Sequence, residues 1–424
     1  MSTEIPTRAP AHAVRAAWAV FAVFVVAGIG MATWASRIPA VRDGLGFSEA
    51  EMGVLLLTGA IGSLVALPLS GMIASRIGAG RTCVSFAALA AAGFAVATLA
   101  VEGDHPLLVR VGLFLGGMGV GIWDAAMNLE GAVVEQRLGK SVMPRFHAGF
   151  SLGTVAGAGI GALAAHAGAS LPGHVITVML IDLLVVMACV RFFEPTAEAA
   201  AAEGMAATDG QADPATAVDT GTGHTLRDTL ATWRESRTLL VGLVVLAAAL
   251  TEGAANDWVS LAVVDGFGTD DSVGAIGLAV FLCAMTLARL AGTSLIDRYG
   301  RVTMLRACGA AALVGVVVFA LVPTLWVALV GVAVWGAGAS LGFPLGMSAA
   351  SDDPKRAALR VSVVSTVGYS AFFVGPALIG FLAEHVGYRD ALLVLAVPVA
   401  VGLLVAGAAK PLPAAPDPAR TLGE

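Results

Sequence analysis

The run AAWAVFAVFVVAGIGMATWASRI (residues 16–38) decides how the rest of this sequence is interpreted. Arg37 is its only charged residue. A transmembrane α-helix needs about 20 predominantly apolar residues to cross the hydrocarbon core of a bilayer. The run is too long for the apolar region of a signal peptide, and similar runs follow it. We therefore interpret it as a retained first membrane helix.

Eleven further apolar runs follow along the chain, in two groups of six when the first run is included. Overall, 58% of the 424 residues are hydrophobic and 13% are charged, against about 25% charged residues in soluble domains. The sequence therefore predicts an all-α membrane protein of twelve transmembrane helices in two related six-helix bundles. The predicted spans are 16–38, 50–74, 82–101, 107–133, 146–166, 173–193, 238–263, 273–296, 303–322, 324–348, 361–383 and 389–409.

Two pairs of segments indicate that the bundles are repeats of one another. WASRIPAVRDGLG (34–46) recurs with a two-residue deletion as WVSLAVVDGFG (258–268), and ASRIG (74–78) recurs as IDRYG (296–300). Parallel repeats that enclose a site near the bilayer midplane are typical of transporters that alternate between two openings. We expect an N-terminal bundle at 1–193 and a C-terminal bundle at 237–424, joined by residues 194–236.

The joining segment has a different composition from the spans. Residues 194–224 contain no Lys, Arg or aromatic residue, so this stretch lacks the means to build a core and is expected to be disordered. TLRDTLATWRES (225–236) is expected to form a short amphipathic helix on the membrane surface.

Basic residues predict the orientation in the membrane. With both termini inside, the inner loops and tails collect nineteen Lys and Arg residues, and the outer side keeps only Arg37, Arg42 and Arg389. Cytoplasmic loops carry an excess of Lys and Arg. We expect a bacterial inner-membrane protein with both termini in the cytoplasm.

Two short loop segments resemble the signature of the major facilitator superfamily, G-x-x-x-D-R-x-G-R/K. The segments are GMIASRIGAGR (71–81), where Ser75 replaces the acid, and GTSLIDRYGR (292–301). The resemblance covers the whole chain. It implies the fold of that family and a gate in which the loop charges pair with neighbouring helix ends, with Glu130 in place of the missing acid. The alternative is that the basic residues only follow the charge bias of inner loops. The residues concerned are Gly71, Arg76, Gly78, Arg81, Glu130, Asp297, Arg298, Gly300 and Arg301.

Within that superfamily, two segments resemble the fucose-permease branch of sugar–proton symporters. IWDAAMNLE (122–130) has an acid and an Asn four residues apart, and HAGFSLG (147–153) places a polar residue before S-x-G. That branch also carries an acidic residue near the outer end of its first helix, where this chain has Trp34, Ser36 and Arg37.

An ionisable side chain at bilayer depth is costly, so it usually faces a cavity and has a function. Asp124 and Glu252 are therefore the candidate proton-coupling residues. Each is followed by an Asn four residues later on the same helix face. The alternative for Asp124 and Asn128 is a structural pair that joins two helices. The candidate substrate-binding residues are Asn128, His147, Trp34, Arg37, Trp123, Asn256, Asp257 and Trp258.

Several of these candidates have a simpler explanation that the sequence leaves open. There are three hypotheses for Arg37: it pairs with Asp257 as an outer gate, it binds an anionic solute, or its side chain extends towards the interface. His147 is a titrating group or an interfacial residue. The Trp side chains stack on a sugar or anchor the helices at the interface. Asp182 has a transport role or only packs against another helix.

The sequence predicts a transporter and not an enzyme. No G-x-x-x-x-G-K-[S/T] loop is present, so transport is expected to draw on an ion gradient or to run as a facilitator. The expected driving force is a proton gradient, and no cofactor or metal is expected. The leading hypothesis is proton-coupled transport of a small polar, sugar-like solute. The alternatives are an exporter of amphipathic compounds and a non-transporting sensor or scaffold. We expect a monomer that contacts the bilayer and its solute and binds no nucleic acid.

Overall fold

The computed structural model describes residues 11–138, 142–193, 231–353 and 356–412, and it contains helices and no strand in these ranges. The expected disordered stretch and the first half of the expected amphipathic helix lie outside these residues. The N-terminal bundle contains α1 (Ala11–Ser36), α2 (Ile38–Leu45), α3 (Glu49–Ile77), α4 (Ala79–Glu102), α5 (Pro106–Leu138), α6 (Met143–His166), α7 (Leu171–Cys189) and η1 (Val190–Phe192). The C-terminal bundle contains α10 (Ser236–Phe267), α11 (Asp271–Tyr299), α12 (Arg301–Leu321), α13 (Leu325–Ala339), α14 (Gly342–Ala350), α15 (Ala357–Tyr369), α16 (Ala371–Val386), α17 (Tyr388–Ala391), η2 (Leu392–Leu395), α18 (Ala396–Val405) and η3 (Ala406–Ala409).

Twelve helical segments among the described residues are long and apolar enough to cross a membrane, which confirms the predicted number of spans. Three of the predicted spans are interrupted by a break between two α-helices, and the twelfth contains the 3-10 segment Leu392–Leu395 between α17 and α18. The first breaks at Arg37, where Pro39 lies at the start of α2. Proline has a fixed φ and no backbone N–H, so it suits the first turn of a new helix. The tenth breaks between Ala339 and Gly342, and the eleventh at Ser370.

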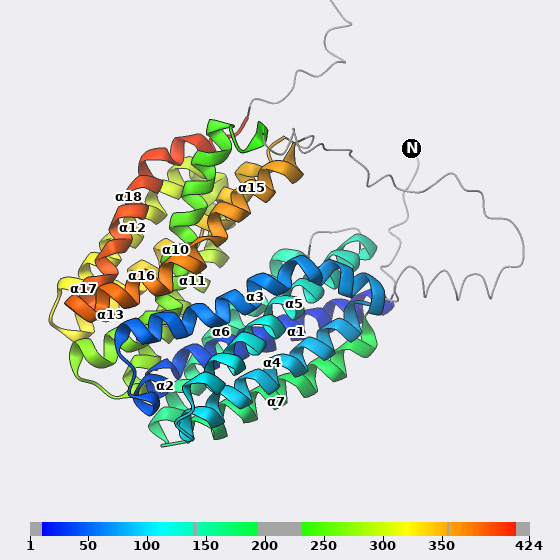
Figure 1. The fold of residues 1–424 in the computed structure, drawn as a ribbon. Helices are drawn as coiled ribbons and strands as arrows, with labels where there is room; N and C mark the ends of the chain where they lie inside the picture. Colours follow the sequence, from blue (N-terminus) through cyan, green and yellow to red (C-terminus); the bar gives the residue numbers. More distant parts are fainter. Residues whose placement is uncertain (1–10, 139–141, 194–230, 354–355, 413–424) are drawn as a thin grey trace, which may run out of the picture.

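The two bundles form the two arms of a V (Figure 1). We term the face at which α1 begins and η3 ends the terminal face, and the other face the opposite face. Helices pack across the bundles mainly as α3 on α16 and α6 on α11, with α2 against α10. In contrast, α15 packs on α10, α14 and α16 of its own bundle. The bundles therefore meet towards the opposite face and diverge towards the terminal face.

Glycine allows the close approach of α3 and α16. A Cβ on Gly380 would lie 2.7 Å from the backbone oxygen of Glu49 and 2.9 Å from the Cα of Gly53. Small residues of this kind let helix backbones approach in lipid. The contact lies in the first turns of α3, so it closes the opposite face.

The repeat is visible in matching helix ends. Gly46 ends α2 and Gly268 ends α10, both with φ of 61°. Gly78 and Gly300 end α3 and α11 with φ of 84° and 81°. Positive φ is readily adopted only by glycine, which explains why these turns keep glycine in both bundles.

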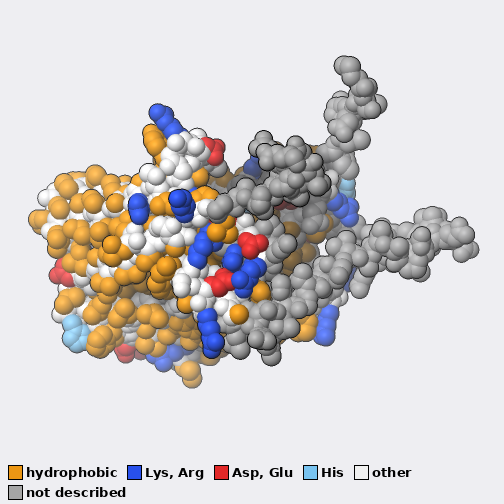
Figure 2. Space-filling model, turned by 90° about the horizontal axis from the view of Figure 1, so that it is seen from above, with side chains coloured by type: hydrophobic (Ala, Val, Ile, Leu, Met, Phe, Trp, Pro, Cys, Tyr) orange, Lys and Arg blue, Asp and Glu red, His pale blue; other side chains and the backbone are white. Residues whose placement is uncertain are grey.

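The surface has the chemistry of a membrane protein. Figure 2 shows a face with many hydrophobic side chains, a central group of Lys, Arg, Asp and Glu side chains, and further charged side chains towards its edges. At the terminal face Asp352 accepts hydrogen bonds from Arg237 at 2.8 Å and Arg301 at 2.9 Å. These ion pairs join the starts of α10 and α12 to the end of α14.

Candidate functional site

Asp124 and Asn128 form one polar pair on α5, about midway along the helix. The Asn128 amide donates hydrogen bonds to the Asp124 backbone oxygen at 2.9 Å and to its Oδ1 at 3.3 Å. The spacing of four residues predicted this shared face. The Asp124 side chain is exposed and Asn128 is half-buried, so the pair faces accessible space.

A cluster of aromatic rings faces Asp124 from the C-terminal bundle. The Asp124 carboxylate acts electrostatically on Tyr369, at the end of α15. The Tyr369 ring centroid lies 6.1 Å from that of Phe343 and 6.1 Å from that of Phe372. Asp124 therefore faces the other bundle and not lipid. Sequence analysis missed these rings, because residues so distant in sequence meet only in the assembled fold.

Glu252 and Arg289 form an ion pair between α10 and α11. The Arg289 Nη2 donates to Glu252 Oε2 at 2.8 Å, and its Nε donates to the Ser340 backbone oxygen at 3.0 Å. Ser340 lies at the break between α13 and α14, where a backbone oxygen is released from the helix. Both side chains are about a quarter exposed. A ring of Phe372 lies next to them, 3.2 Å from the position of a Cβ on Gly253.

His147 of α6 connects the two groups. Its exposed ring lies edge-on to Phe24 of α1, with centroids 5.2 Å apart, and Arg289 acts on it electrostatically from the other bundle. Phe24 lies near the middle of α1, so His147 lies deeper than its place in the first turns of α6 suggests. We term Asp124, Asn128, His147, Glu252, Arg289 and Tyr369 the central polar cluster.

The arrangement combines a carboxylate, an amide, an imidazole and a charge pair with flat aromatic rings. Such a group is able to hydrogen-bond a polar solute, stack on its ring and exchange protons with water. Its two parts belong to different bundles. A relative motion of the bundles therefore changes the cluster.

The structure places the predicted Trp residues in packed positions. Trp258 is fully buried against Tyr388, with ring centroids 5.5 Å apart, and Trp123 is buried. Trp34 packs on Phe94 at 5.3 Å. In this conformation both Trp123 and Trp258 are packed against protein and offer no free face, so their contact with a solute stays a prediction. A tryptophan beside polar residues in sequence points away from them on a helix.

The gate hypothesis expected Arg37 to pair with Asp257, but the two residues do not form an ion pair in this conformation. Its Nη2 donates to the Ala169 backbone oxygen at 2.9 Å, and its electrostatic partner in the other bundle is Asp271. Asn256 and Asp257 are half-buried and make no hydrogen bond or ion pair with other described residues. The ion pair that links the bundles at the opposite face is instead Arg42 with Asp265.

The loop signature residues lie at the terminal face. Arg76, Arg81, Asp297 and Arg298 are exposed. Arg298 lies over the ring of Tyr299 at 5.3 Å, and Arg301 pairs with Asp352. Glu130 is buried and acts electrostatically on Cys83 of α4. Gly71 has open space around it, whereas Gly78 and Gly300 form the turns described above. The loops on the two arms are apart in this conformation, so the structure does not test their pairing as a gate.

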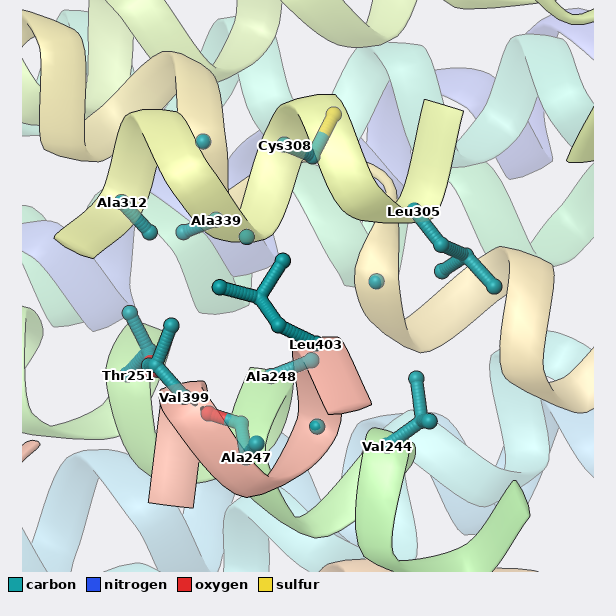
Figure 3. Close-up of a pocket in the computed structure, with 14 residues that line it drawn as sticks. Val244, Ala247, Ala248, Thr251, Leu305, Cys308, Ala312, Ala339, Val399 and Leu403 are labelled. Carbon is teal, nitrogen blue, oxygen red and sulfur yellow. Dashed lines mark hydrogen bonds between the residues drawn. The ribbon is translucent and has the colours of Figure 1, made fainter. Parts of the chain in front are cut away.

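A separate small cavity lies inside the C-terminal bundle, between α10, α12, α14 and α18 (Figure 3). Its volume is about 40 Å³, and Val244, Leu305 and Leu403 are among its lining residues. That volume holds no more than a few water molecules. The cavity does not include the central polar cluster and is too small for a solute.

Comparisons with known proteins agree with this architecture. The sequence matches the Major Facilitator Superfamily at residues 19–351 and 241–423. It is 34% identical to an uncharacterised transporter of Sinorhizobium fredii over 87% of this chain and 92% of the relative. It is 29% identical to an uncharacterised MFS-type transporter of Yersinia pestis over 91% of this chain and 93% of the relative.

Solved structures share the fold at low sequence identity. The nucleoside transporter NupG superposes with a TM-score of 0.69 and 15% identity, over 95% of this chain and 100% of that one. The Escherichia coli fucose:proton symporter FucP superposes with a TM-score of 0.58 and 15% identity, over 93% of this chain and 98% of that one. With its twelve spans, its two arms and these matches, the chain belongs to the major facilitator superfamily of transporters.

Proposed function

We propose that this transporter is a secondary active carrier that moves a small polar solute by proton-coupled alternating access. Asp124 takes up and releases the coupling proton. The observation that carries the proposal is an exposed carboxylate at mid-span that faces the opposite bundle, beside Asn128 and Tyr369. An ionisable group at that depth is costly unless it has a task.

The proposed solute is sugar-like, with several hydroxyl groups on a ring. Asn128, His147 and the Glu252–Arg289 pair offer donors and acceptors, and Tyr369 and Phe372 offer flat faces. The names of the structural neighbours, a nucleoside transporter and a fucose:proton symporter, agree with a solute of this class. Glu252 is the second proposed proton-coupling residue, because a proton on it would release Arg289.

The proposed location is a bacterial inner membrane, with the terminal face in the cytoplasm. The predominance of Lys and Arg in the loops of that face supports the orientation, and the relatives are bacterial. The V then opens inwards, to the side on which an imported solute is released. The driving force is the proton gradient.

Uptake into proteoliposomes tests this function. A panel of labelled monosaccharides, nucleosides and organic acids is presented with an imposed pH gradient. We expect accumulation by the wild-type protein, and we expect Asp124→Asn to abolish accumulation while solute exchange at equal pH remains. Glu102→Gln, which removes an exposed acid at the opposite face, is the matched control. Unchanged accumulation by the Asp124→Asn variant overturns the proposal.

One observation favours a second candidate function. The ring cluster of Phe343, Tyr369 and Phe372 facing an acid also suits an amphipathic cation, through cation–π contacts. If the protein exports such compounds, lipophilic cations should raise its thermal unfolding temperature and sugars should not. A ligand at 100 times its dissociation constant stabilises by about 2.7 kcal/mol, which is enough to separate the two outcomes.

A further inference from the structure

A second line of polar side chains lies inside the N-terminal bundle, apart from the central polar cluster. It occupies the seam where α1 packs on α7. On α7, His174 and Asp182 lie eight residues apart and so share one helix face. Gly30 and Thr33 of α1, and Arg37 at the break that follows α1, lie opposite them at spacings of three and four residues.

The members of this line are buried and leave polar atoms without partners. Asp182 is 2% exposed and His174 is 7% exposed. Among the described residues, Asp182 Oδ2, both ring nitrogens of His174, Thr33 Oγ1 and two guanidinium nitrogens of Arg37 have no hydrogen-bond partner. Most buried polar groups in proteins are hydrogen-bonded, so a row of four exceptions calls for an explanation.

The contacts fix the order of the line. A Cβ on Gly30 would lie 2.7 Å from Asp182 Oδ2, so the carboxyl group occupies the space that this glycine leaves. A Cβ on Gly161 of α6 would lie 2.0 Å from Ser36 Oγ and 3.8 Å from the His174 ring, which brings these two side chains together. Arg37 acts electrostatically on His174. From the opposite face these contacts give the order Arg37, His174 and Asp182, and Thr33 lies on α1 between Gly30 and Arg37.

The outer end of the line reaches a hollow at the opposite face. The hollow has a volume of about 490 Å³ and is lined by Asp43, His166, Asp270 and Asp271 among others. Arg37 is the electrostatic partner of Asp271. Arg37 therefore lies between the hollow and His174, held there by its hydrogen bond to the Ala169 backbone oxygen.

Among the described residues, no charged side chain acts as a counter-ion to Asp182. On α7 the nearest titratable groups are His174 and Cys189, and on α4 they are Arg81, Cys83 and Glu102, all close to the helix ends. Arg37, at the break after α1, lies almost two helical turns from Gly30, which contacts Asp182. His147 of α6 faces the central polar cluster. An isolated carboxylate in such a site carries a desolvation cost that the neutral acid avoids.

We propose that Asp182 is a further proton-binding site of this transporter, besides Asp124 and Glu252, connected through His174 and Thr33 to the hollow at the opposite face and capped by Arg37 in this conformation. The proposal rests on the proposed proton-coupled function for its role in transport. The site itself is independent of Asp124. Asp182 holds a proton here and exchanges it with water of the opposite face when the cap moves.

Infrared spectroscopy of the purified protein in nanodiscs tests the site without any solute. The difference between wild type and Asp182→Asn should contain the carbonyl band of a protonated carboxyl group. After transfer to D₂O, the shift of that band should be at least tenfold faster in Arg37→Ala, in which the cap is removed. Arg110→Ala is the matched control, because Arg110 also has a buried nitrogen without a partner but lies on α5.

Three outcomes overturn the proposal. One is the absence of a protonated carboxyl band from the difference spectrum, and another is equal exchange in Arg37→Ala and wild type. The third uses His174→Phe, which keeps the carboxyl group and serves if Asp182→Asn does not fold. If adding His174→Phe to Arg37→Ala does not slow the exchange, the proposal is overturned. The proposed function is tested separately, because the band of Asp182 is measured whether or not Asp124→Asn abolishes accumulation.

Discussion

Among single residues, the ion pair of Glu252 with Arg289 is the contact most easily disturbed in the central polar cluster. Both side chains are about three-quarters buried, and the guanidinium also binds the Ser340 backbone oxygen. We expect Glu252→Gln to lower the free energy of unfolding by about 2 kcal/mol, because it leaves a partly buried cation without its counter-charge. Thermal unfolding in detergent measures the change.

The double variant Glu252→Gln/Arg289→Gln is the control for that prediction. It removes both charges, so we expect it to recover most of the lost stability. A double variant at least as unstable as the sum of the two single variants would show that the charges do not interact.

The sequence was informative at this scale where the partners are close along the chain. Asp124 and Asn128 share a helix face because they are four residues apart, and that contact is present. Arg289 and Tyr369 were not predicted as partners of Glu252 and Asp124, because the chain spacing of such pairs contains no information about tertiary contact. The burial of Trp123 and Trp258 has a related reason: a one-residue step on a helix turns a side chain by about 100°, so neighbours in sequence face different surroundings.

At the scale of elements, Glu235 ties the start of α10 to the start of α15. It accepts hydrogen bonds from Arg360 at 2.8 Å and Thr238 at 2.7 Å, and it pairs with Arg356. Burial alone raises the pKa of the Glu235 carboxyl, but these hydrogen bonds and charges outweigh it and hold the pKa below its ordinary value. The bound form is therefore the charged form.

The lowered pKa gives the contact a pH dependence. A carboxyl group whose pKa is lower in the folded state contributes stability above its ordinary pKa of about 4.3, and that stability is lost as pH falls through the lowered value. We expect Glu235→Gln to cost about 1 kcal/mol at pH 7 and to flatten the loss of stability between about pH 5 and pH 3. Chemical unfolding as a function of pH measures this, and a slope equal to that of wild type would contradict it.

The crossing of α3 and α16 depends on two glycines. Gly380→Ala places a methyl group against the backbone of α3, so we expect the two helices to separate. The conformation that is closed at the opposite face should be destabilised by about 2 kcal/mol. Electron–electron resonance distances between labels at Glu51 and His385 measure the separation. Gly71→Ala, on α3 with open space around it, is the control and should leave the distance unchanged.

The sequence predicted the number and order of the spans but not their breaks. Hydropathy responds to length and apolar content, and these are unchanged when a helix restarts. Arg37 and Ser340 lie at such breaks, and each takes part in the polar contacts described above. The breaks are therefore the elements that sequence patterns locate least well, although they contribute directly to the candidate sites.

At the scale of the whole molecule, the opposite face is closed by charge as well as by packing. Arg42 of α2 pairs with Asp265 of α10, and the Arg42 guanidinium lies 6.0 Å from the centroid of the Tyr388 ring. Asp265 and Asp43 occupy the same place in the two repeats, three residues before the glycine that ends each matching segment, and both contact Arg42. One arginine thus holds equivalent corners of the two bundles together.

We expect Asp265→Asn to shift the molecule towards a conformation open at the opposite face. A partly exposed ion pair contributes about 1 kcal/mol, so the open fraction should rise about fivefold. The label pair at Glu51 and His385 measures that fraction. Asp270→Asn is the matched control, because it removes one negative charge from the hollow at this face but no ion pair between the bundles. If both variants raise the open fraction equally, the effect comes from the total charge of the hollow and not from the contact with Arg42.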